Sequence, residues 1–569
     1  MPCCAACGGV FVTEYLKLKK ANCKNCYKCI RHCPVKSISF SSDQANIVQD
    51  ECILCGQCFV TCPQNAKIIR GDVDRARELL AGNAPVVASI APAFVANYAG
   101  ATIGSMRAAL RCLGFSDAQE TALGATIVKR HYDDMVRKGQ QRVIISSCCH
   151  SVNLLIQKYY PGALPYIARV VSPMQAHCAM LKREAPGTKT VFIGPCISKK
   201  AEAEQYPGDV DCVLTFEELS AWLELEGVTL EPDTKEPRDG KARLFPTSGG
   251  ILRSMEKDCP DCSYIAVDGI DNCVSALKDI LAGGVDRCFV EMSACRGSCV
   301  GGPAMDKEHG FILKDTITVG GYAGEKDFDL PIPDERTLAK DIPFMPAHHL
   351  KPGASAIEEV LAKTGKTLPE HELNCGSCGY DTCRDKAAAV LQGKAELTMC
   401  LPYLMDKAES FSDNIIKNTP NGILVLNESL EVQQINAAAC HMTGVKSASD
   451  VLGEQVVRIL DPHVFFEVMR TGHNVYEKWT YLAEYQRYVT QTVIYDRSYN
   501  IIILIMRDVT EEENNRAGKA EISRKTIEIT DKVIEKQMRT VQEIASLLGE
   551  TAAETKIALT KLKETLQGE

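Results

Sequence analysis

The chain has 569 residues, 24% of them charged, and a formal net charge of −9. That length exceeds what one hydrophobic core supports, so we expect several domains. The acidic balance without a basic block argues against nucleic-acid binding, and no run reaches the roughly 18 apolar residues of a membrane span. The chain also begins without an export signal, which predicts a cytoplasmic protein.

Cysteine is the compositional outlier, with 28 residues gathered in tight clusters. Clustered thiols in a long chain of cytosolic type favour metal ligation over a disulfide framework. The first cluster, Cys3, Cys4 and Cys7, either begins a further metal site or consists of free thiols near the terminus. No dinucleotide-binding or P-loop glycine motif occurs, so neither NAD nor ATP chemistry is predicted.

The next segment carries the motif C-x2-C-x2-C-x3-C-P twice, which is typical of bacterial two-cluster ferredoxins. Three thiolates on one tight loop cover one face of a cubane, so the fourth ligand comes from the other copy of the motif. We therefore expect one 4Fe–4S cluster on Cys23, Cys26, Cys29 and Cys62, and a second on Cys52, Cys55, Cys58 and Cys33. A pair of zinc knuckles is the alternative, which the duplicated triple spacing and the prolines disfavour.

Beyond Asp72, short apolar strands alternate with helices, as in βαβ units whose parallel strands are buried on both faces. The expected strands are Val86–Ser89, Val143–Ser146, Thr190–Ile193 and Val285–Glu291, and the helices between them include Gly104–Leu113 and Thr126–Lys138. Ligands collect at the carboxyl ends of such strands. The pattern thus predicts that five cysteines meet at one site suited to a soft metal cluster, namely Cys148, Cys149, Cys196, Cys295 and Cys299.

The three cysteine segments, SSCCH, GPCISKK and SACRGSC, resemble the loops TSCCPxW, MPCxxKxxE and ExMACxxGCxxGG of the FeFe-hydrogenases, over about Ala84–Asp341. The resemblance implies an H-cluster, which joins a 4Fe–4S part to a two-iron subcluster with CO, CN and a bridging dithiolate. It assigns the 4Fe–4S part to Cys149, Cys196, Cys295 and Cys299, the last of which would also bridge to the two irons. Lys199 would donate to a cyanide and Cys148 would relay protons, a spare structural thiol being the alternative for Cys148. The remaining cofactor-binding residues implied are Ala91, Pro92, Ser172, Pro173 and Ser293.

The chain departs from these loops at several positions. His150 replaces the usual Pro of the first loop, and Gly194 and Ser293 replace a Met of the second and third loops. Loss of thioether packing predicts a wetter environment for the two-iron site. Lys129 and Arg130 stand where the family usually has paired acids that serve its proton path, so slow turnover is expected.

A second cysteine module follows the Pro-rich connector 341–352. Its spacing, C-x2-C-x4-C-x16-C, resembles a small 4Fe–4S module of anaerobic redox proteins, with zinc as the alternative. The expected ligands are Cys375, Cys378, Cys383 and Cys400, with a helix from Arg384 to Leu397 before the last of them. Another pair, Cys259 and Cys262, has knuckle spacing but no second pair nearby, so it is not expected to bind a metal.

Residues 409–510 resemble a PAS domain, from a strand at Gly422–Asn427 to a closing strand at Ile501–Arg507. Its histidines, His441, His463 and His473, are more typical of surface residues than of haem ligands. In the tail, apolar residues recur at steps of three and four, which predicts one long helix over 511–569 that pairs with a second copy. No histidine follows His473, so a signal would leave through a partner rather than through a phosphorylated histidine.

The fold class expected is multidomain α/β and α+β. The parts are an N-terminal segment with the two-cluster ferredoxin domain (1–71), the H-cluster domain (72–352), a 4Fe–4S domain (353–405), a PAS domain (406–510) and a coiled-coil helix (511–569).

Two functions are consistent with this organisation. The tail and the altered loops favour a hydrogen-sensing FeFe-hydrogenase of low turnover, and the alternative is a catalytic, ferredoxin-linked hydrogenase with the PAS domain as a docking or tuning module. A protein that only carries a non-hydrogenase cluster is a third reading. The partners implied are H2 and protons, a ferredoxin-like carrier, hydrogenase maturation proteins and a downstream kinase or phosphatase, in an anaerobic cell. Neither nucleic acid nor membrane is expected as a partner.

Overall fold

The computed structural model describes residues 14–19, 22–232, 239–305, 311–331, 333–347, 352–548, 561 and 563. Cys3, Cys4 and Cys7, the first candidate metal site, lie outside these residues. The chain divides into two compact units, Met1–Tyr403 and Leu404–Glu569. Within the described ranges, no helix is both long and apolar enough to cross a membrane.

The two copies of the cysteine repeat fold into matching halves. Each copy contains a one-turn helix, α1 (Lys28–Arg31) or α2 (Gln57–Val60), and two antiparallel strand pairs accompany them. The strand pairs are β1 (Leu16–Leu18) with β4 (Lys67–Ile69), and β2 (Ile38–Ser41) with β3 (Gln44–Ile47). Tyr27 and Gly56 precede the helices at equivalent positions, and both have positive φ. The duplicated sequence thus produces a duplicated backbone, bent sharply around each group of cysteines.

Two parallel sheets form the core of the next domain. One sheet has the order β6-β5-β8-β9 and the other β10-β11-β7, and every strand pair in them is parallel. The strands are β5 (Val86–Ile90), β6 (Asp117–Glu120), β7 (Val143–Ile145), β8 (Lys189–Gly194), β9 (Cys212–Thr215), β10 (Ser263–Asp268) and β11 (Cys288–Ser293). All residues of β7, β9 and β11 are buried, as expected for strands covered on both faces. The predicted parallel strands are confirmed, but they belong to two sheets.

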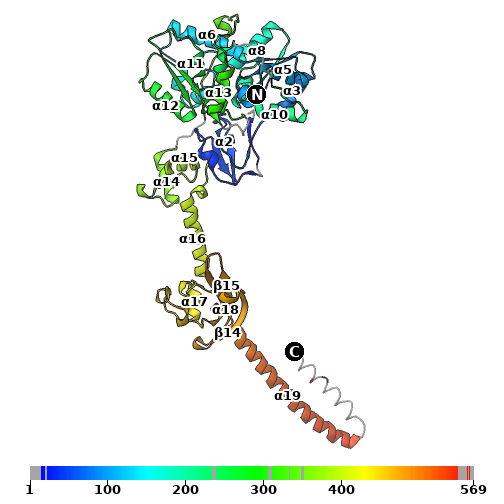
Figure 1. The fold of residues 1–569 in the computed structure, drawn as a ribbon. Helices are drawn as coiled ribbons and strands as arrows, with labels where there is room; N and C mark the ends of the chain where they lie inside the picture. The colour runs from blue at the N-terminus through cyan, green and yellow to red at the C-terminus, as the bar shows by residue number, and fades with distance from the viewer. Residues whose placement is uncertain are drawn as a thin grey trace, which may run out of the picture. The chain divides into compact units, whose positions relative to one another are not determined.

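Helices surround the two sheets (Figure 1). They are α3 (Val73–Leu80), α4 (Phe94–Asn97), α5 (Ile103–Cys112), α6 (Ala122–Lys138), α7 (His150–Tyr159), α8 (Pro173–Glu184), α9 (Ser198–Gln205), α10 (Phe216–Leu225), α11 (Gly250–Ser254), α12 (Ile270–Leu281) and α13 (Ile312–Tyr322). Helices α6 and α8 pack so closely that a Cβ atom at Gly124 would lie 2.3 Å from the carbonyl oxygen of Pro173, so only glycine fits there. The helices predicted at 104–113 and 126–138 are confirmed as α5 and α6.

The small cysteine module consists of α14 (Ala354–Lys363) packed on α15 (Cys383–Leu391). Helix α15 is shorter than predicted, because it ends at Leu391 rather than at Leu397. Gly393 has φ +70° two residues later, a conformation that commonly terminates helices. A single 3-10 turn, Leu397–Met399, then leads to Cys400.

In the second unit, five antiparallel strands form one sheet in the order β13-β12-β16-β15-β14. Its elements are β12 (Gly422–Leu426), β13 (Val432–Ile435), α17 (Ala437–Met442), α18 (His463–Thr471), β14 (Val475–Leu482), β15 (Arg487–Asp496) and β16 (Ile501–Asp508). The long helix α16 (Leu401–Asn418) precedes them. Leu424, Val493 and Leu504 are fully buried on the face that packs against α17 and α18. The three histidines considered for haem are all exposed, so none lies in this core.

The tail differs from the single long helix that was predicted. Helix α19 runs from Thr510 to Leu548. The ammonium of Lys563 lies 3.5 Å from a carboxylate oxygen of Asp531, whereas one straight helix would separate these residues by about 48 Å. The expectation of one continuous helix to residue 569 is therefore wrong. Most of the expected heptad positions, from Val541 onward, have side chains outside the described part of the chain.

Candidate metal centre

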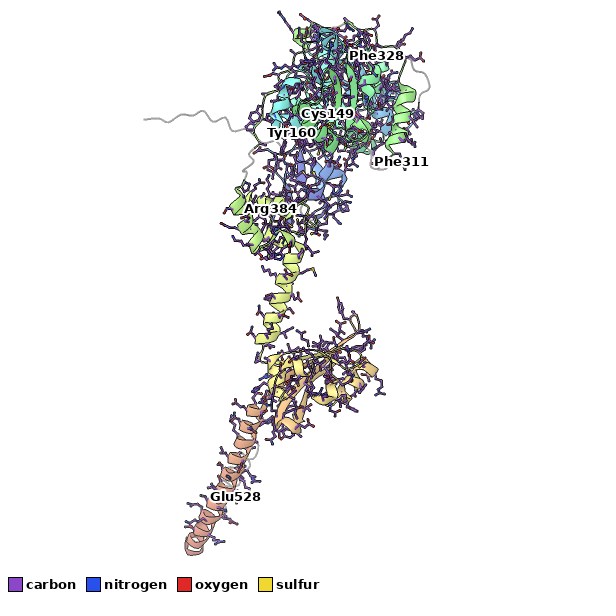
Figure 2. The ribbon with its side chains drawn as sticks, turned by 90° about the vertical axis from the view of Figure 1, so that its left-hand side faces the viewer. Cys149, Tyr160, Phe311, Phe328, Arg384 and Glu528 are labelled. Carbon is purple, nitrogen blue, oxygen red and sulfur yellow. The ribbon has the colours of Figure 1, made fainter. Side chains whose placement is uncertain are left out.

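Three loops leave the carboxyl ends of β7, β8 and β11 and line one cavity with an empty volume of about 740 Å³. Cys149, from the first loop, is labelled in Figure 2. The backbone N–H of Met292 donates to Ser146 Oγ at 3.1 Å, which joins the first and third loops. The N–H of Ala304 donates to the carbonyl of Pro195 at 3.0 Å, which joins the second and third. The cavity therefore draws on both parallel sheets.

Four sulfur atoms, those of Cys149, Cys196, Cys295 and Cys299, lie close enough to influence one another electrostatically. Burial raises the pKa of the Cys149 and Cys295 thiols, and the neighbouring sulfurs raise both further. The pKa of Cys299 is raised to about 12 for the same reasons. Thiols crowded in this way ionise readily only beside a cation, and a bound metal deprotonates a coordinating thiol outright.

The arrangement fits a cluster better than a single ion. Among the described residues, no three His, Cys, Asp or Glu side chains are grouped so as to hold one metal ion. The cysteines instead surround a cavity whose remaining wall is mostly apolar, including Phe192, Phe245 and Ile251. Ligands that each bind a different iron of a cubane need to stand further apart than the ligands of one ion. The four-thiolate donor set therefore suits a 4Fe–4S cluster.

Glycines allow the third loop to fold tightly around its two cysteines. A Cβ atom at Gly297, which has φ +76°, would lie 2.3 Å from the side chain of Ile312. At Gly301 a Cβ atom would lie 2.0 Å from the carbonyl oxygen of Arg296. Any larger residue at either position would displace backbone, and with it Cys295 or Cys299.

Cys148 contacts a buried tyrosine that sequence reasoning did not identify. The hydroxyl oxygen of Tyr132, on α6, lies 3.2 Å from Cys148 Sγ and 3.0 Å from Ser147 Oγ. The Ser147 hydroxyl donates to the carbonyl of Val170 at 2.7 Å. Burial raises the pKa of the Cys148 thiol to about 12, so at neutral pH this sulfur keeps its proton.

Lys199 reaches the cavity as one member of a buried ionic network. Its ammonium donates to Glu202 Oε2 at 2.5 Å and to the carbonyl of Cys148 at 3.0 Å. Lys340 donates to the other oxygen of Glu202 at 2.5 Å and to Gln175 at 3.0 Å. Although burial opposes it, the two ammonium groups hold the pKa of Glu202 well below its usual range. Glu202 also raises the pKa of Lys199 against the effect of burial, so both groups stay charged.

Most of the other predicted cofactor-binding residues also line the cavity. Ala91, Pro92, Pro173 and Ser293 are all in its wall. Ser172 does not line it, because it is the buried N-cap residue of α8, where its backbone N–H donates to Gln175 Oε1 at 3.4 Å.

The wall of the cavity near Gly194 is apolar. A Cβ atom at Gly194 would lie 2.8 Å from the ring of Phe192 and 2.9 Å from Ala91. Phe192 thus fills space beside this position, and both Met174 and Met292 line the cavity nearby. Aromatic and aliphatic side chains therefore surround the position of Gly194, and the wetter environment of the two-iron site stays a prediction.

Lys129 and Arg130 are structural here. Lys129 is buried and donates to Asp327 at 2.5 Å, while Arg130 donates to the carbonyls of Phe328 and Leu330 at 3.2 and 3.1 Å. Both basic residues therefore attach α6 to the segment around Phe328 (Figure 2).

The ferredoxin cysteines sort into the two expected groups. Cys23, Cys26, Cys29 and Cys62 line one cavity. In the other group, Cys33 acts on Cys52, Cys55 and Cys58 and raises the pKa of each, in addition to the larger effect of burial. Cys55 also raises the pKa of Cys295, which places the second group beside the hydrogenase-like loops. A Cβ atom at Gly56 would lie 2.4 Å from Pro303, so the two domains meet at a position that requires glycine.

The four cysteines of the small module, Cys375, Cys378, Cys383 and Cys400, line a cavity of their own. Cys262 raises the pKa of Cys288, after the larger effect of burial, and Cys259 in turn raises the pKa of Cys262. The three cysteines therefore lie near one another.

Tyr132, Glu202 and Glu291 are the functional candidates that the sequence did not single out. Glu202 and Glu291 left usable signals, since they occupy the final position of the pattern PCxxKxxE and the first position of ExMAC, whereas Tyr132 left none. Glu291 lines the cavity and accepts the backbone N–H of Leu252 at 3.0 Å. Burial raises the pKa of Glu291 to about 7.

Comparison with known families gives four matches. Residues 84–303 match the iron only hydrogenase large subunit, C-terminal domain. Residues 15–67 match a 4Fe-4S dicluster domain, 369–402 match an Fe-S cluster family and 410–509 match the PAS fold.

Individual proteins resemble parts of the chain. The periplasmic Fe hydrogenase large subunit of Nitratidesulfovibrio vulgaris is 26% identical over 285 residues, which span 40% of this chain and 68% of that protein. The cytosolic Fe-S cluster assembly factor NAR1 of Eremothecium gossypii is 37% identical over 90 residues, which span 16% of this chain and 20% of that protein. The solved structure of a variant of FeFe-hydrogenase HydA1 from Chlamydomonas reinhardtii has 18% identity and a TM-score of 0.37, covering 46% of this chain and 91% of that chain. The hydrogenases align over between 50% and 68% of their own length.

Proposed function

Because residues 84–303 form an iron-only hydrogenase domain joined to iron–sulfur and PAS domains, we propose that this chain is a hydrogen-sensing FeFe-hydrogenase. In this proposal, slow and reversible conversion of H2 to protons and electrons is coupled through 4Fe–4S clusters to the PAS domain and α19. The observation that carries it is the single cavity where Cys149, Cys196 and Cys299 meet Lys199 and Cys148.

Each residue at this cavity has a distinct role in the proposal. Cys149, Cys196, Cys295 and Cys299 would hold the H-cluster, which supplies the irons at which the H–H bond is broken or formed. Lys199, fixed by Glu202, presents an ammonium to an anionic ligand. Cys148 Sγ holds a proton and exchanges it with the hydroxyl of Tyr132, 3.2 Å away.

The remaining clusters would form the electron relay. We assign them to the three cysteine groups described above, with the second ferredoxin group next to the H-cluster because Cys55 lies near Cys295. We also propose domain boundaries after residues 71, 352, 405 and 510, and the family matches at 15–67, 84–303, 369–402 and 410–509 fall within them.

Two features support sensing over bulk turnover. Lys129 and Arg130, where acids would serve a proton path, are tied to the segment around Phe328 and are not free to carry protons. The PAS domain and the exposed helix α19 also provide an output that electron transfer alone does not need.

A catalytic, ferredoxin-linked hydrogenase is the second candidate. The observation in its favour is that Cys148 keeps its place beside the cavity and has a hydrogen-bonded neighbour, as a proton relay requires.

The deciding experiment assembles the two-iron cofactor into protein that already holds its 4Fe–4S clusters, and measures H2-dependent dye reduction. Sensing predicts slow but measurable turnover. A rate of ~10³ per second or above, in the upper range of enzymes, would support the catalytic candidate instead. No hydrogen oxidation by protein with a spectroscopically complete cofactor would contradict both.

A further inference from the structure

Two buried lysines line the cavity of the small cysteine module without a carboxylate beside them. Its cavity, with an empty volume of about 480 Å³, is lined by all four cysteines together with Lys366 and Lys386. Lys366 is 9% exposed and Lys386 is 5% exposed. No Asp or Glu is among the residues that line this cavity. Two cationic groups are therefore held beside the sulfur ligands in a low-dielectric environment, where charges interact strongly.

The contacts of the two ammonium groups are with neutral atoms and sulfur. Lys366 Nζ lies 3.3 Å from Cys400 Sγ and 3.2 Å from the carbonyl of Thr364. Lys386 Nζ donates to the carbonyl of Leu397 at 3.2 Å. Glu372, an acidic residue nearby in sequence, pairs with Arg384 at 3.1 Å. Burying two ammonium groups without a carboxylate costs several kcal/mol unless another anion is present. A cluster with four thiolate ligands is such an anion.

The small module also packs directly on the ferredoxin domain. Lys394 Nζ contacts Glu51 Oε2 at 2.5 Å, and Arg31 donates to the carbonyl of Ser377 at 3.2 Å. A Cβ atom at Gly379 would lie 3.0 Å from the side chain of Ile30. The module is therefore in close contact with α1, which lies within the first copy of the ferredoxin repeat.

Tyr380 connects the cysteines on the two sides of this contact. Its ring is buried in the hydrophobic cluster that contains both Cys33 and Cys378. Both cysteines raise the pKa of its hydroxyl, after the larger effect of burial. Tyr380 thus lies near Cys33 of the second ferredoxin group and near Cys378 of the small module.

The first ferredoxin group has a different charge arrangement, and at the second group one half-buried lysine, Lys158, donates to the carbonyl of Cys52 at 2.8 Å. The cavity of Cys23, Cys26, Cys29 and Cys62 contains one buried lysine, Lys67, whose ammonium donates to the carbonyl of Ala45 at 2.5 Å. Its other lysines, Lys24 and Lys28, are exposed or half-exposed. Solvated charges are screened and influence a cluster less than buried ones.

We propose that the cluster on Cys375, Cys378, Cys383 and Cys400 is the electron sink of the relay, and that Lys366 and Lys386 make it so. A reduced ferredoxin-type cluster gives up one electron and is oxidised, and the small module's cluster takes that electron and is reduced, with no bond or proton transferred. Reduction adds one negative charge beside two buried ammonium groups, which stabilise it. This inference rests on the proposed assignment of 4Fe–4S clusters.

The position of the sink links electron transfer to the second unit along the chain. Cys400, which contacts Lys366, is immediately followed by α16, the helix that leads to the PAS fold. Reduction therefore adds negative charge to a cluster whose proposed ligand Cys400 directly precedes α16.

The test uses the full-length protein, reconstituted with iron and sulfide but without the two-iron cofactor, in a potentiometric titration followed by electron paramagnetic resonance. A Cys383→Ser variant identifies the signal of the small module by difference. We expect this signal to titrate at a higher potential than the ferredoxin signals. Lys366→Met and Lys386→Met should each lower the reduced-to-oxidised ratio at the wild-type midpoint about tenfold, which is about 59 mV for a one-electron couple. Lys366→Arg should preserve most of it.

Lys363→Met is the matched control, because Lys363 is an exposed lysine of the same module. The inference is overturned if the module titrates below either ferredoxin cluster, if it binds zinc instead of iron, or if both buried-lysine variants behave like Lys363→Met. Should one variant lose its iron, the other decides the outcome. A shift found in protein that never oxidises hydrogen would refute the proposed function and keep this inference, so the two failures are distinguishable.

Discussion

The hydroxyl oxygen of Tyr132 lies 3.2 Å from the sulfur of Cys148. The Ser147 hydroxyl already donates to Val170, so the Tyr132 proton is left to Ser147 Oγ or to Cys148 Sγ. This contact gives Cys148 a hydrogen-bonding partner on α6, the helix that also carries Lys129.

Replacing Tyr132 with Phe should slow hydrogen turnover at least tenfold, because the ring still packs on Phe289 while the proton partner of Cys148 is lost. Turnover and H2–D2O exchange measure the effect, and the infrared spectrum of the bound cofactor should not change. Tyr98→Phe is the control, since the Tyr98 hydroxyl donates to the carbonyl of Phe216 and Tyr98 does not line the cavity. Equal rates in the two variants would remove Tyr132 from the proton path.

Replacing Cys148 with Ala should keep the cluster spectra and abolish most turnover. The sulfur is not among the four proposed cluster ligands, but its raised pKa of about 12 keeps a proton available beside the cavity. Cys112→Ala removes an exposed thiol and should leave the rate unchanged. Turnover that survives the loss of Cys148 would mean that this residue is a structural thiol.

Replacing Glu202 with Gln should destabilise the hydrogenase-like domain by ~3–5 kcal/mol, because Lys199 and Lys340 would lose the carboxylate that they share. Chemical unfolding of the apoprotein in a Trp479→Phe background measures this, since Trp222 is then the only tryptophan left of the two.

Two companion variants make the Glu202 result specific. Adding Lys340→Met to Glu202→Gln should restore part of the stability, because one uncompensated ammonium is removed. Glu217→Gln, at an exposed position of α10, should change stability by no more than about 0.5 kcal/mol. If Glu202→Gln is as mild as Glu217→Gln, the network does not contribute to folding.

The raised pKa of Glu291 predicts that the free energy of unfolding depends on pH. Its folded-state pKa of about 7 lies above the ordinary value of 4.5, so the folded protein binds this proton more tightly than the unfolded chain. The contribution is therefore fully present below pH 4.5 and is lost as pH rises through 7, with a limit of roughly 3 kcal/mol. Glu291→Gln should lose this dependence between pH 5 and 8 in the Trp222 assay. Parallel pH profiles for the two proteins would show that Glu291 does not titrate in this range.

Truncation after Arg516 should leave hydrogen chemistry intact and weaken dimerisation. Helix α19 carries Ile522, Ile529 and Val533 on its surface, with exposed fractions of 67%, 62% and 52%, at steps of seven and four residues. Burying such a stripe against a second copy would stabilise a dimer by the hydrophobic effect. Sedimentation of the full-length protein, the truncated protein and an Ile522→Glu/Ile529→Glu variant tests this. If all three proteins sediment with the same number of chains per particle, α19 does not mediate dimerisation, and the contact between Asp531 and Lys563 is one within a single chain.

Much of the fold followed from local pattern. The alternation of apolar strands and helices predicted β5, β7, β8 and β11 because burial on both faces demands continuous apolar runs. The weaker strands β6 and β10 were missed, since Asp117–Glu120 and Ser263–Asp268 carry polar residues that local propensity does not assign to a strand. The helix predicted to reach Leu397 failed at Gly393, where one backbone conformation outweighs the helical pattern around it.

For the metal sites, the sequence by itself predicted the candidate ligands, because thiolates that share a cluster often lie on tight loops and their spacing is written in the chain. Only the tertiary structure decided what surrounds those ligands. Lys340 reaches Glu202 across 138 residues, Lys366 reaches Cys400 across 34, and Tyr132 reaches Cys148 from another element. Such partners are chosen by packing and by the cost of burying a charge alone, and neither leaves a fixed spacing in the sequence.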